Sequence, residues 1–223
     1  MITQSQAALG VLEHKETCAR YYRALAARLG RLTNEDGGPL RIVGVTSSAP
    51  GEGVTTVAAN LAITEAVSGR KSVLLVDANE QDPSVARLFC CDECGPVPET
   101  VGQLFDGFIE PTAIEGLAVV TVGGGIASQR SAISPHQLRE EIDQAKQEYD
   151  LVIVDLSPAT GISPCFEWGP LLDGVLLVLE AERTSVQAAL QVKTRLINSR
   201  AHLLGVVFNK RPLHVPNWLY RRL

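Results

Sequence analysis

Short apolar runs alternate with longer mixed segments along most of the chain. Runs rich in Val, Leu and Ile occupy residues 41–46, 72–77, 117–122, 151–155, 174–179 and 203–209. Several are apolar at successive positions, which is typical of strands that are covered on both faces. The segments between them, residues 54–69, 83–90, 136–148 and 184–199, have the length and pattern of helices. The alternation predicts an α/β fold in three layers, doubly wound around a mostly parallel sheet.

The first 40 residues follow a different pattern. Residues 1–10 are expected to form a loose arm, and residues 11–33 a helix with Leu12, Tyr22, Leu25 and Leu29 on one face. The sequence NEDGGP at residues 34–39 is a turn cluster. We therefore divide the chain into an arm and helix (1–37), a main domain (38–211) and a short C-terminal tail (212–223).

The connection after the first predicted strand has the features of a phosphate-binding loop. Residues 48–56 read SAPGEGVTT and precede a predicted helix. A glycine-containing turn at this place points backbone N–H groups at an anion, and the helix N-terminus adds partial positive charge. The predicted phosphate-binding residues are Pro50, Gly51, Glu52, Gly53, Val54, Thr55 and Thr56. For such a turn alone, a tight connection that binds nothing is the alternative interpretation.

This loop lacks the lysine of the usual pattern, which ends in Gly-Lys-Ser/Thr. Val54 occupies the lysine position, whereas Thr55 keeps the hydroxyl that binds Mg²⁺. Asp77 and Asp155 each end an apolar run. Carboxylates at such strand ends suit a Mg²⁺ ion that is also bound by the phosphates of a ligand. A lone Asp after a strand is usually a helix cap or a turn residue. Together with the loop, Thr55, Asp77 and Asp155 predict a site for ATP or ADP with Mg²⁺.

These segments resemble the bacterial tyrosine kinases of the capsular and exopolysaccharide family, which are relatives of MinD and ParA. The resemblance covers about residues 38–211. VTSSAPGEGVTTVAANLA resembles the family's Walker A segment, VLLVDANEQDPSVARLF its Walker A′ and YDLVIVDLSPA its Walker B, while LLGVVFNKR resembles its last strand.

The resemblance implies a P-loop NTPase fold and assigns roles to individual residues. Asp77 would be the base or water-positioning carboxylate, and Asp155 would support the Mg²⁺ shell. Thr55 would bind Mg²⁺, and Asn209 would hydrogen-bond the nucleotide base. The resemblance also implies a membrane adaptor of a polysaccharide export system as partner, and it leaves a homo-oligomer open.

The chain departs from the family pattern at several positions. Besides Val54, the second Asp and the Arg of the second motif are replaced by Asn79 and Gln81, and the first Pro after Walker B by Ser157. The family's oligomerisation motif is blurred, and the C-terminal tyrosine cluster is reduced to Tyr220. Since phosphoryl transfer depends on charge neutralisation, we expect weak nucleotide binding and little turnover.

Composition narrows the possible functions further. The 223 residues carry a net charge of −5, so no nucleic-acid partner is expected. The start has no signal peptide and the apolar runs are too short to span a bilayer, so we expect a cytoplasmic protein that reaches the inner membrane face through a partner. The five cysteines fit reduced thiols. Cys90, Cys91 and Cys94 lack a second pair of ligands, which disfavours a metal site there.

Three functions remain open at this point. The first is a kinase-like nucleotide-binding protein, weak or inactive in catalysis, that regulates polysaccharide synthesis or export. The second is an active tyrosine autokinase of the same family. The third is a positioning ATPase like MinD or ParA, which is disfavoured because such proteins have a loop lysine and a membrane helix or a basic face.

Overall fold

The computed structural model describes residues 15–79, 84–89, 109–121 and 135–212. Its centre is a seven-stranded sheet in the order β3-β4-β2-β5-β1-β6-β7. Neighbouring strands are parallel except for β3, which runs antiparallel to β4. The strands are β1 (Ile42–Ser47), β2 (Val73–Ala78), β3 (Glu110–Pro111), β4 (Leu117–Thr121), β5 (Leu151–Leu156), β6 (Gly174–Glu180) and β7 (Leu203–Asn209).

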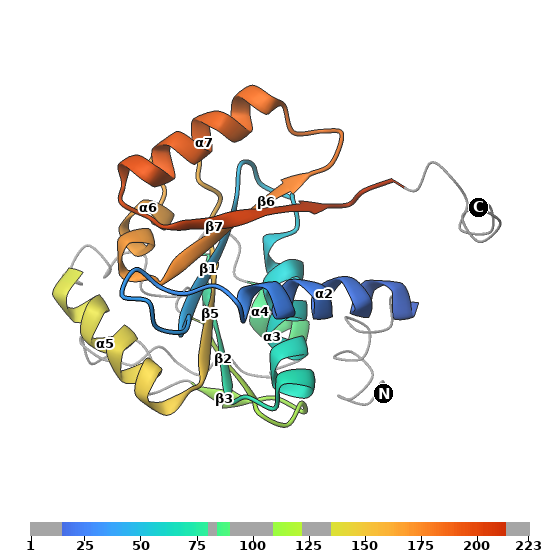
Figure 1. Ribbon diagram of the computed structural model, residues 1–223, viewed down its shortest axis with the longest axis vertical. Helices are drawn as coiled ribbons and strands as arrows, with labels where there is room; N and C mark the ends of the chain where they lie inside the picture. The colour runs from blue at the N-terminus through green and yellow to red at the C-terminus, as the bar shows by residue number, and fades with distance from the viewer. Residues whose placement is uncertain (1–14, 80–83, 90–108, 122–134, 213–223) are drawn as a thin grey trace.

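Helices cover both faces of this sheet and complete the three layers (Figure 1). They are α2 (Lys15–Leu29), α3 (Val54–Gly69), α4 (Val85–Phe89), α5 (Pro135–Glu148), α6 (Cys165–Trp168), the 3-10 turn η2 (Gly169–Leu171) and α7 (Val186–Asn198). One apolar core joins the sheet to α5, α6 and α7, and the other joins it to α2, α3 and α4. Successive strand residues such as Ile42 and Val43 enter opposite cores, which is why these strands are apolar at every position.

The predicted fold class and the six predicted strands are confirmed by this arrangement. The helix predicted for residues 11–33 is too long at its C-terminal end, because α2 ends at Leu29. Gly30 follows, and Thr33 pairs with Pro39 around the turn that the sequence predicted. The structure adds β3 and α6, which the sequence analysis did not predict. Along residues 15–79, 84–89, 109–121 and 135–212, none of the helices has the length and apolarity needed to cross a bilayer.

The strand order brings together the three strand ends that carry polar residues. Because β5 lies between β2 and β1, their carboxyl ends are adjacent at one edge of the sheet. Asp155 of β5 is the register partner of Asp77 on β2 and of Val45 on β1. In open α/β sheets ligands bind beyond this edge, so the fold positions a site there.

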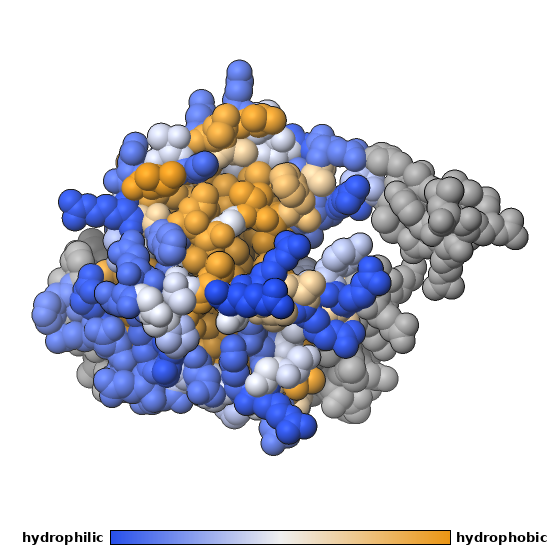
Figure 2. Space-filling model, viewed as in Figure 1, coloured by the Kyte–Doolittle hydropathy of each residue, from blue (hydrophilic) through white to orange (hydrophobic). Residues whose placement is uncertain are grey.

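The strand β7 forms one margin of the sheet and is less covered than the central strands β1, β2 and β5. Each of its residues is at most half-buried, and Val206 and Phe208 are 45% and 69% exposed. Figure 2 shows an apolar surface over this strand and over α7, where Leu190 and Ile197 are also exposed. An apolar edge strand is a surface that proteins usually cover with another element or a partner.

Candidate nucleotide-binding site

The connection from β1 to α3 forms an open loop at the helix N-terminus. Gly51 and Gly53 have φ angles of 81° and 92°, a left-handed conformation that side chains disfavour. No side chain of the described residues caps α3, and its first hydrogen bond runs from Val57 N to the Gly53 carbonyl at 3.0 Å. The N–H groups of residues 54–56 therefore lack an intrahelical acceptor, and they are available to an anion.

Glu52 folds its side chain into the base of the loop and is only 3% exposed. Its carboxylate accepts hydrogen bonds from the Ser48 and Ala49 amides at 2.7 and 3.0 Å, and from the Glu180 amide at 3.3 Å. The Thr184 hydroxyl also donates to it. Burial acts to raise the pKa of Glu52, but these donors outweigh it and hold the pKa below its ordinary value. Glu52 was predicted to bind phosphate; its side chain stabilises the loop by accepting these hydrogen bonds.

Val54, at the lysine position, is turned into the apolar core. It is the first residue of α3 and is 9% exposed among the side chains between α3 and the sheet. Lys71 does not replace the missing charge, because it precedes β2 at the other edge of the sheet. There it pairs with Glu65 at 2.8 Å. The cation that the sequence analysis missed is Lys210, whose Nζ donates to the Gly51 carbonyl of the loop at 2.5 Å.

Asp155 is a buried carboxyl group without a hydrogen-bond partner among the described residues. It has no solvent exposure, and neither of its oxygens meets a donor at hydrogen-bond distance in the described part of the chain. Burial raises the pKa of Asp155 to about 7, and the nearby Asp77 charge adds to this. The Thr55 hydroxyl lies close enough to oppose the rise in pKa without completing a hydrogen bond. A buried carboxylate of this kind beside a phosphate loop is typical of a cation ligand.

Asp77 is equally buried, but its oxygens are engaged. Oδ2 accepts from the Ser84 and Val85 amides at 2.8 and 2.9 Å, at the start of α4, and Oδ1 accepts from the Asn79 amide at 3.1 Å. Ser84 also donates from its hydroxyl to the Thr55 hydroxyl at 3.3 Å. Asp77 therefore fixes the segment after β2 against the loop, a capping role that the sequence had left as the alternative.

Two of the departures from the family pattern contact each other. The Ser157 hydroxyl donates to the side-chain oxygen of Asn79 at 3.1 Å and thereby links the ends of β2 and β5. Gln81, like the cysteines at 90, 91 and 94, lies outside the described residues.

Asn209, predicted to bind the base, lies against the phosphate loop. Its side-chain nitrogen donates to the Glu52 carbonyl at 2.9 Å. Within the described residues its side-chain oxygen accepts no hydrogen bond, so this atom is the one that can accept from a nucleotide base.

The same contact makes Gly53 sensitive to substitution. A Cβ atom added to Gly53 would lie 2.3 Å from the Asn209 side-chain nitrogen, in a left-handed conformation. We expect Gly53→Ala to lower the free energy of unfolding by about 1–3 kcal/mol and to weaken nucleotide binding. Urea unfolding and nucleotide titration would test this, with Gly205→Ala as control because a Cβ there meets nothing within 4 Å. Equal stability of the two variants would contradict the strained contact.

The oxygen donors of this site fit Mg²⁺. Asp155 and Thr55 offer a carboxylate and a hydroxyl, and Mg²⁺ usually takes one or two carboxylates with phosphates and waters as further ligands. Among the described residues no group of three or more His, Cys, Asp or Glu forms a protein-only metal centre. The unsatisfied oxygens of Asp155 are the observation that supports a bound divalent cation.

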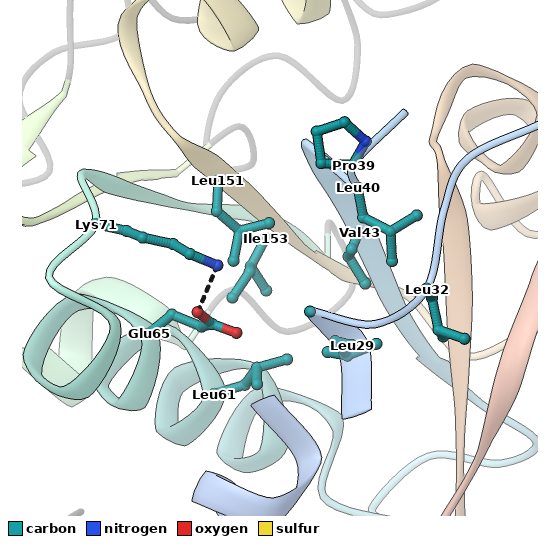
Figure 3. A pocket seen from close by; sticks show the side chains of 11 residues that line it. Leu29, Leu32, Pro39, Leu40, Val43, Leu61, Glu65, Lys71, Leu151 and Ile153 are labelled. Atoms are coloured by element: carbon teal, nitrogen blue, oxygen red, sulfur yellow. Dashed lines mark ion pairs between the residues drawn. The ribbon is translucent and has the colours of Figure 1, made fainter. Parts of the chain in front are cut away.

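A small cavity lies at the opposite edge of the sheet. It has a volume of about 110 Å³ and is lined by apolar side chains of α2, α3, β1 and β5, with the Lys71–Glu65 ion pair on one side (Figure 3). Ligand pockets usually measure roughly 300–1,000 Å³, so this cavity is too small for a nucleotide.

Relatives of known identity share most of this chain. Tyrosine-protein kinase YwqD of Bacillus subtilis is 29% identical over 176 residues, 78% of this chain and 74% of the relative. Tyrosine-protein kinase CpsD of Streptococcus pneumoniae is 27% identical over 211 residues, 93% and 90% of the two chains. The succinoglycan biosynthesis transport protein ExoP of Rhizobium meliloti is 28% identical over 185 residues, which are 80% of this chain and 23% of that protein. No protein-family model matches the chain.

Solved structures show the same fold. The BceF tyrosine kinase domain has a TM-score of 0.74 at 22% identity, covering 92% of this chain and 82% of that one. The VpsO kinase domain has a TM-score of 0.72 at 25% identity, covering 88% and 95%. MinD from Pyrococcus horikoshii, complexed with Mg-ADP, has a TM-score of 0.61 at 22% identity, covering 82% and 76%. The homologues of this chain are therefore bacterial tyrosine-protein kinases, and its fold is that of their kinase domains and of the MinD P-loop ATPases.

Proposed function

We propose that this chain binds ATP or ADP with Mg²⁺ at the loop of residues 50–56 and is weak or inactive in phosphoryl transfer. The observation that carries the proposal is the buried Asp155, which has no hydrogen-bond partner in the described part of the chain and lies beside a loop whose lysine position is the buried Val54. Backbone amides and the α3 N-terminus would hold the phosphates. Asp155 and Thr55 would hold Mg²⁺, which neutralises phosphate charge when bound. Asp77 would keep its capping contacts and position the segment after β2.

The relatives support a proposal for the biological role. We assign the chain to the regulation of capsule or exopolysaccharide synthesis or export, because a succinoglycan biosynthesis transport protein is among its homologues. A membrane adaptor at the inner face of the membrane would be the partner, and the exposed apolar residues of β7 support a protein partner. Residues 38–211 would form the nucleotide-binding unit, with residues 1–37 and 212–223 flanking it.

The test restores the missing charge. We expect Val54→Lys to increase the affinity for Mg-ATP about 10- to 100-fold, because a hydrogen bond from a charged donor contributes roughly 1.5–3 kcal/mol. Titration calorimetry with ATP and ADP, with and without Mg²⁺, measures this. Val67→Lys is the matched control, since Val67 lies on the same helix and is 59% exposed. Absence of binding by both the wild type and Val54→Lys would refute the nucleotide site.

An active tyrosine autokinase is the second candidate, favoured by the names of the relatives. Mass spectrometry after incubation with Mg-ATP distinguishes the two. Phosphotyrosine in the pure wild type, or ATP hydrolysis that Asp77→Ala abolishes, would contradict catalytic weakness. Unmodified wild-type protein and phosphorylated Val54→Lys protein would support it.

A further inference from the structure

The end of β7 and the residue that follows it donate hydrogen bonds to the phosphate loop. Asn209 and Lys210 are consecutive in the sequence, and they bind consecutive carbonyl groups of the loop. The Asn209 side-chain nitrogen donates to the Glu52 carbonyl at 2.9 Å, and Lys210 Nζ donates to the Gly51 carbonyl at 2.5 Å. Lys210 has a φ of 53°, an unusual left-handed conformation at the residue that follows the strand.

Lys210 is anchored in this place by an ion pair. Its Nζ lies 3.2 Å from Glu180 Oε2, at the end of the neighbouring strand β6. Glu180 is also paired with Arg183 at 3.2 Å, so its carboxylate has a second cationic partner. The Lys210 side chain is 46% exposed and therefore bears its charge at the mouth of the site. Its ammonium group contacts the loop directly, at the Gly51 carbonyl.

A contact on a carbonyl group of the loop also changes the N–H group of the same peptide unit. The Gly51 carbonyl and the Glu52 N–H belong to one peptide group, as do the Glu52 carbonyl and the Gly53 N–H. A cation bound to a carbonyl oxygen polarises the peptide and makes its N–H a stronger donor, because hydrogen bonds in a chain strengthen one another. In a phosphate loop it is these N–H groups that meet the anion. Lys210 can therefore strengthen phosphate binding without touching the phosphate.

We propose that Lys210 is the positioning cation that compensates for the missing loop lysine at Val54. It acts from outside the loop, through the Gly51–Glu52 peptide group and through its positive charge at the site, and its ligand is the polyphosphate of a nucleoside di- or triphosphate. This inference rests on the proposed nucleotide-binding function. It explains how a loop without its own ammonium group keeps an electrostatic contribution to phosphate binding.

The experiment is a double-mutant cycle on the full chain, with Mg-ADP as the probe in titration calorimetry. We expect Lys210→Met to weaken Mg-ADP binding on the order of tenfold, and Lys210→Arg to retain most of the affinity. Lys193→Met, the control, removes the same charge from an exposed position on α7 and should change affinity less than twofold. Raising the salt concentration should weaken binding by the wild type more than by Lys210→Met.

The Val54→Lys background separates compensation from mere support of the loop. If Lys210 supplies the missing charge, its loss should cost much less affinity when Val54→Lys provides an ammonium group inside the loop. An equal loss in both backgrounds, or no loss in the wild type, would overturn the proposal. If Val54→Lys binds Mg-ADP and the wild type does not, Lys210 fails as the compensating cation while the nucleotide site stands. If neither binds, both the inference and the proposed function fail.

Discussion

Asp155→Asn is expected to make the ligand-free protein more stable at neutral pH, although it removes a residue proposed to hold Mg²⁺. In the folded state burial raises the pKa of Asp155 from 3.8 to about 7. Between these values the folded chain binds more protons than the unfolded chain, so stability falls as the pH rises and levels off above about 7. The full loss is on the order of 4 kcal/mol, since each pKa unit corresponds to about 1.4 kcal/mol. A neutral asparagine does not ionise and avoids this loss.

Urea unfolding between pH 5 and pH 9 in the presence of EDTA measures the effect. The wild type should lose stability across the lower half of this range, whereas Asp155→Asn should not. Asp143→Asn serves as the control, because Asp143 is an exposed carboxylate on α5. When the same variants are titrated with ADP in the presence of Mg²⁺ instead of EDTA, Asp155→Asn should bind ADP more weakly than the wild type. It should lose the part of the affinity that depends on Mg²⁺. Identical pH profiles of wild type and Asp155→Asn would show that this carboxyl group is solvated or paired.

This combination of effects is typical of a residue kept for binding. An unpaired buried carboxylate destabilises the chain that carries it, and a bound cation removes the penalty. Folding alone would favour an apolar or amide side chain at the end of β5. That a carboxylate stands there instead supports the proposal that the site binds a cation.

The sequence predicted the fold well because the central strands carry a strong pattern. Strands such as β2 and β5 are buried at every position, so they appear in the sequence as uninterrupted apolar runs. The strand β3 and the helix α6 have only two and four residues, too few to produce a recognisable period. The C-terminal end of α2 was overestimated because the apolar spacing continues to Leu32 although the chain turns after Gly30.

The sequence predicted that Asp77 and Asp155 lie together in the candidate site, but it could not assign the contacts that each of them makes. Strand ends placed Asp77 and Asp155 together, because parallel strands share a carboxyl edge. Which of them caps α4 and which stays unpartnered depends on the path of the chain after β2, and no local pattern records that path. Lys210 lies 159 residues from the carbonyl that it binds, so its role depends on the sheet order and on its left-handed turn. The motif NKR offered a signal, but only Asn209 was assigned from it.

Glu52→Ala is expected to lower the free energy of unfolding at pH 7 by roughly 3–5 kcal/mol. The substitution leaves the amides of Ser48, Ala49 and Glu180 without their buried acceptor, and each unsatisfied buried group costs roughly 1–3 kcal/mol before water and relaxation repay part of it. Loss of this brace should also loosen the loop and weaken nucleotide binding. Urea unfolding measures the stability, with Glu167→Ala as the exposed control on α6. A loss below about 1 kcal/mol would mean that the loop holds its shape without this carboxylate.

The pH dependence of this residue should have the opposite sign to that of Asp155. Hydrogen bonds hold the pKa of Glu52 below its ordinary value of 4.5, so its stabilisation is complete above that value and is lost as the pH falls through the folded pKa. The difference in stability between wild type and Glu52→Ala should therefore shrink in acid. The buried carboxylates of Glu52 in the loop and Asp155 on β5 thus have opposite pH dependences: ionised Glu52 stabilises the fold, whereas ionised Asp155 destabilises it until a cation binds. A difference that stays constant down to pH 3 would contradict a charged, hydrogen-bonded Glu52.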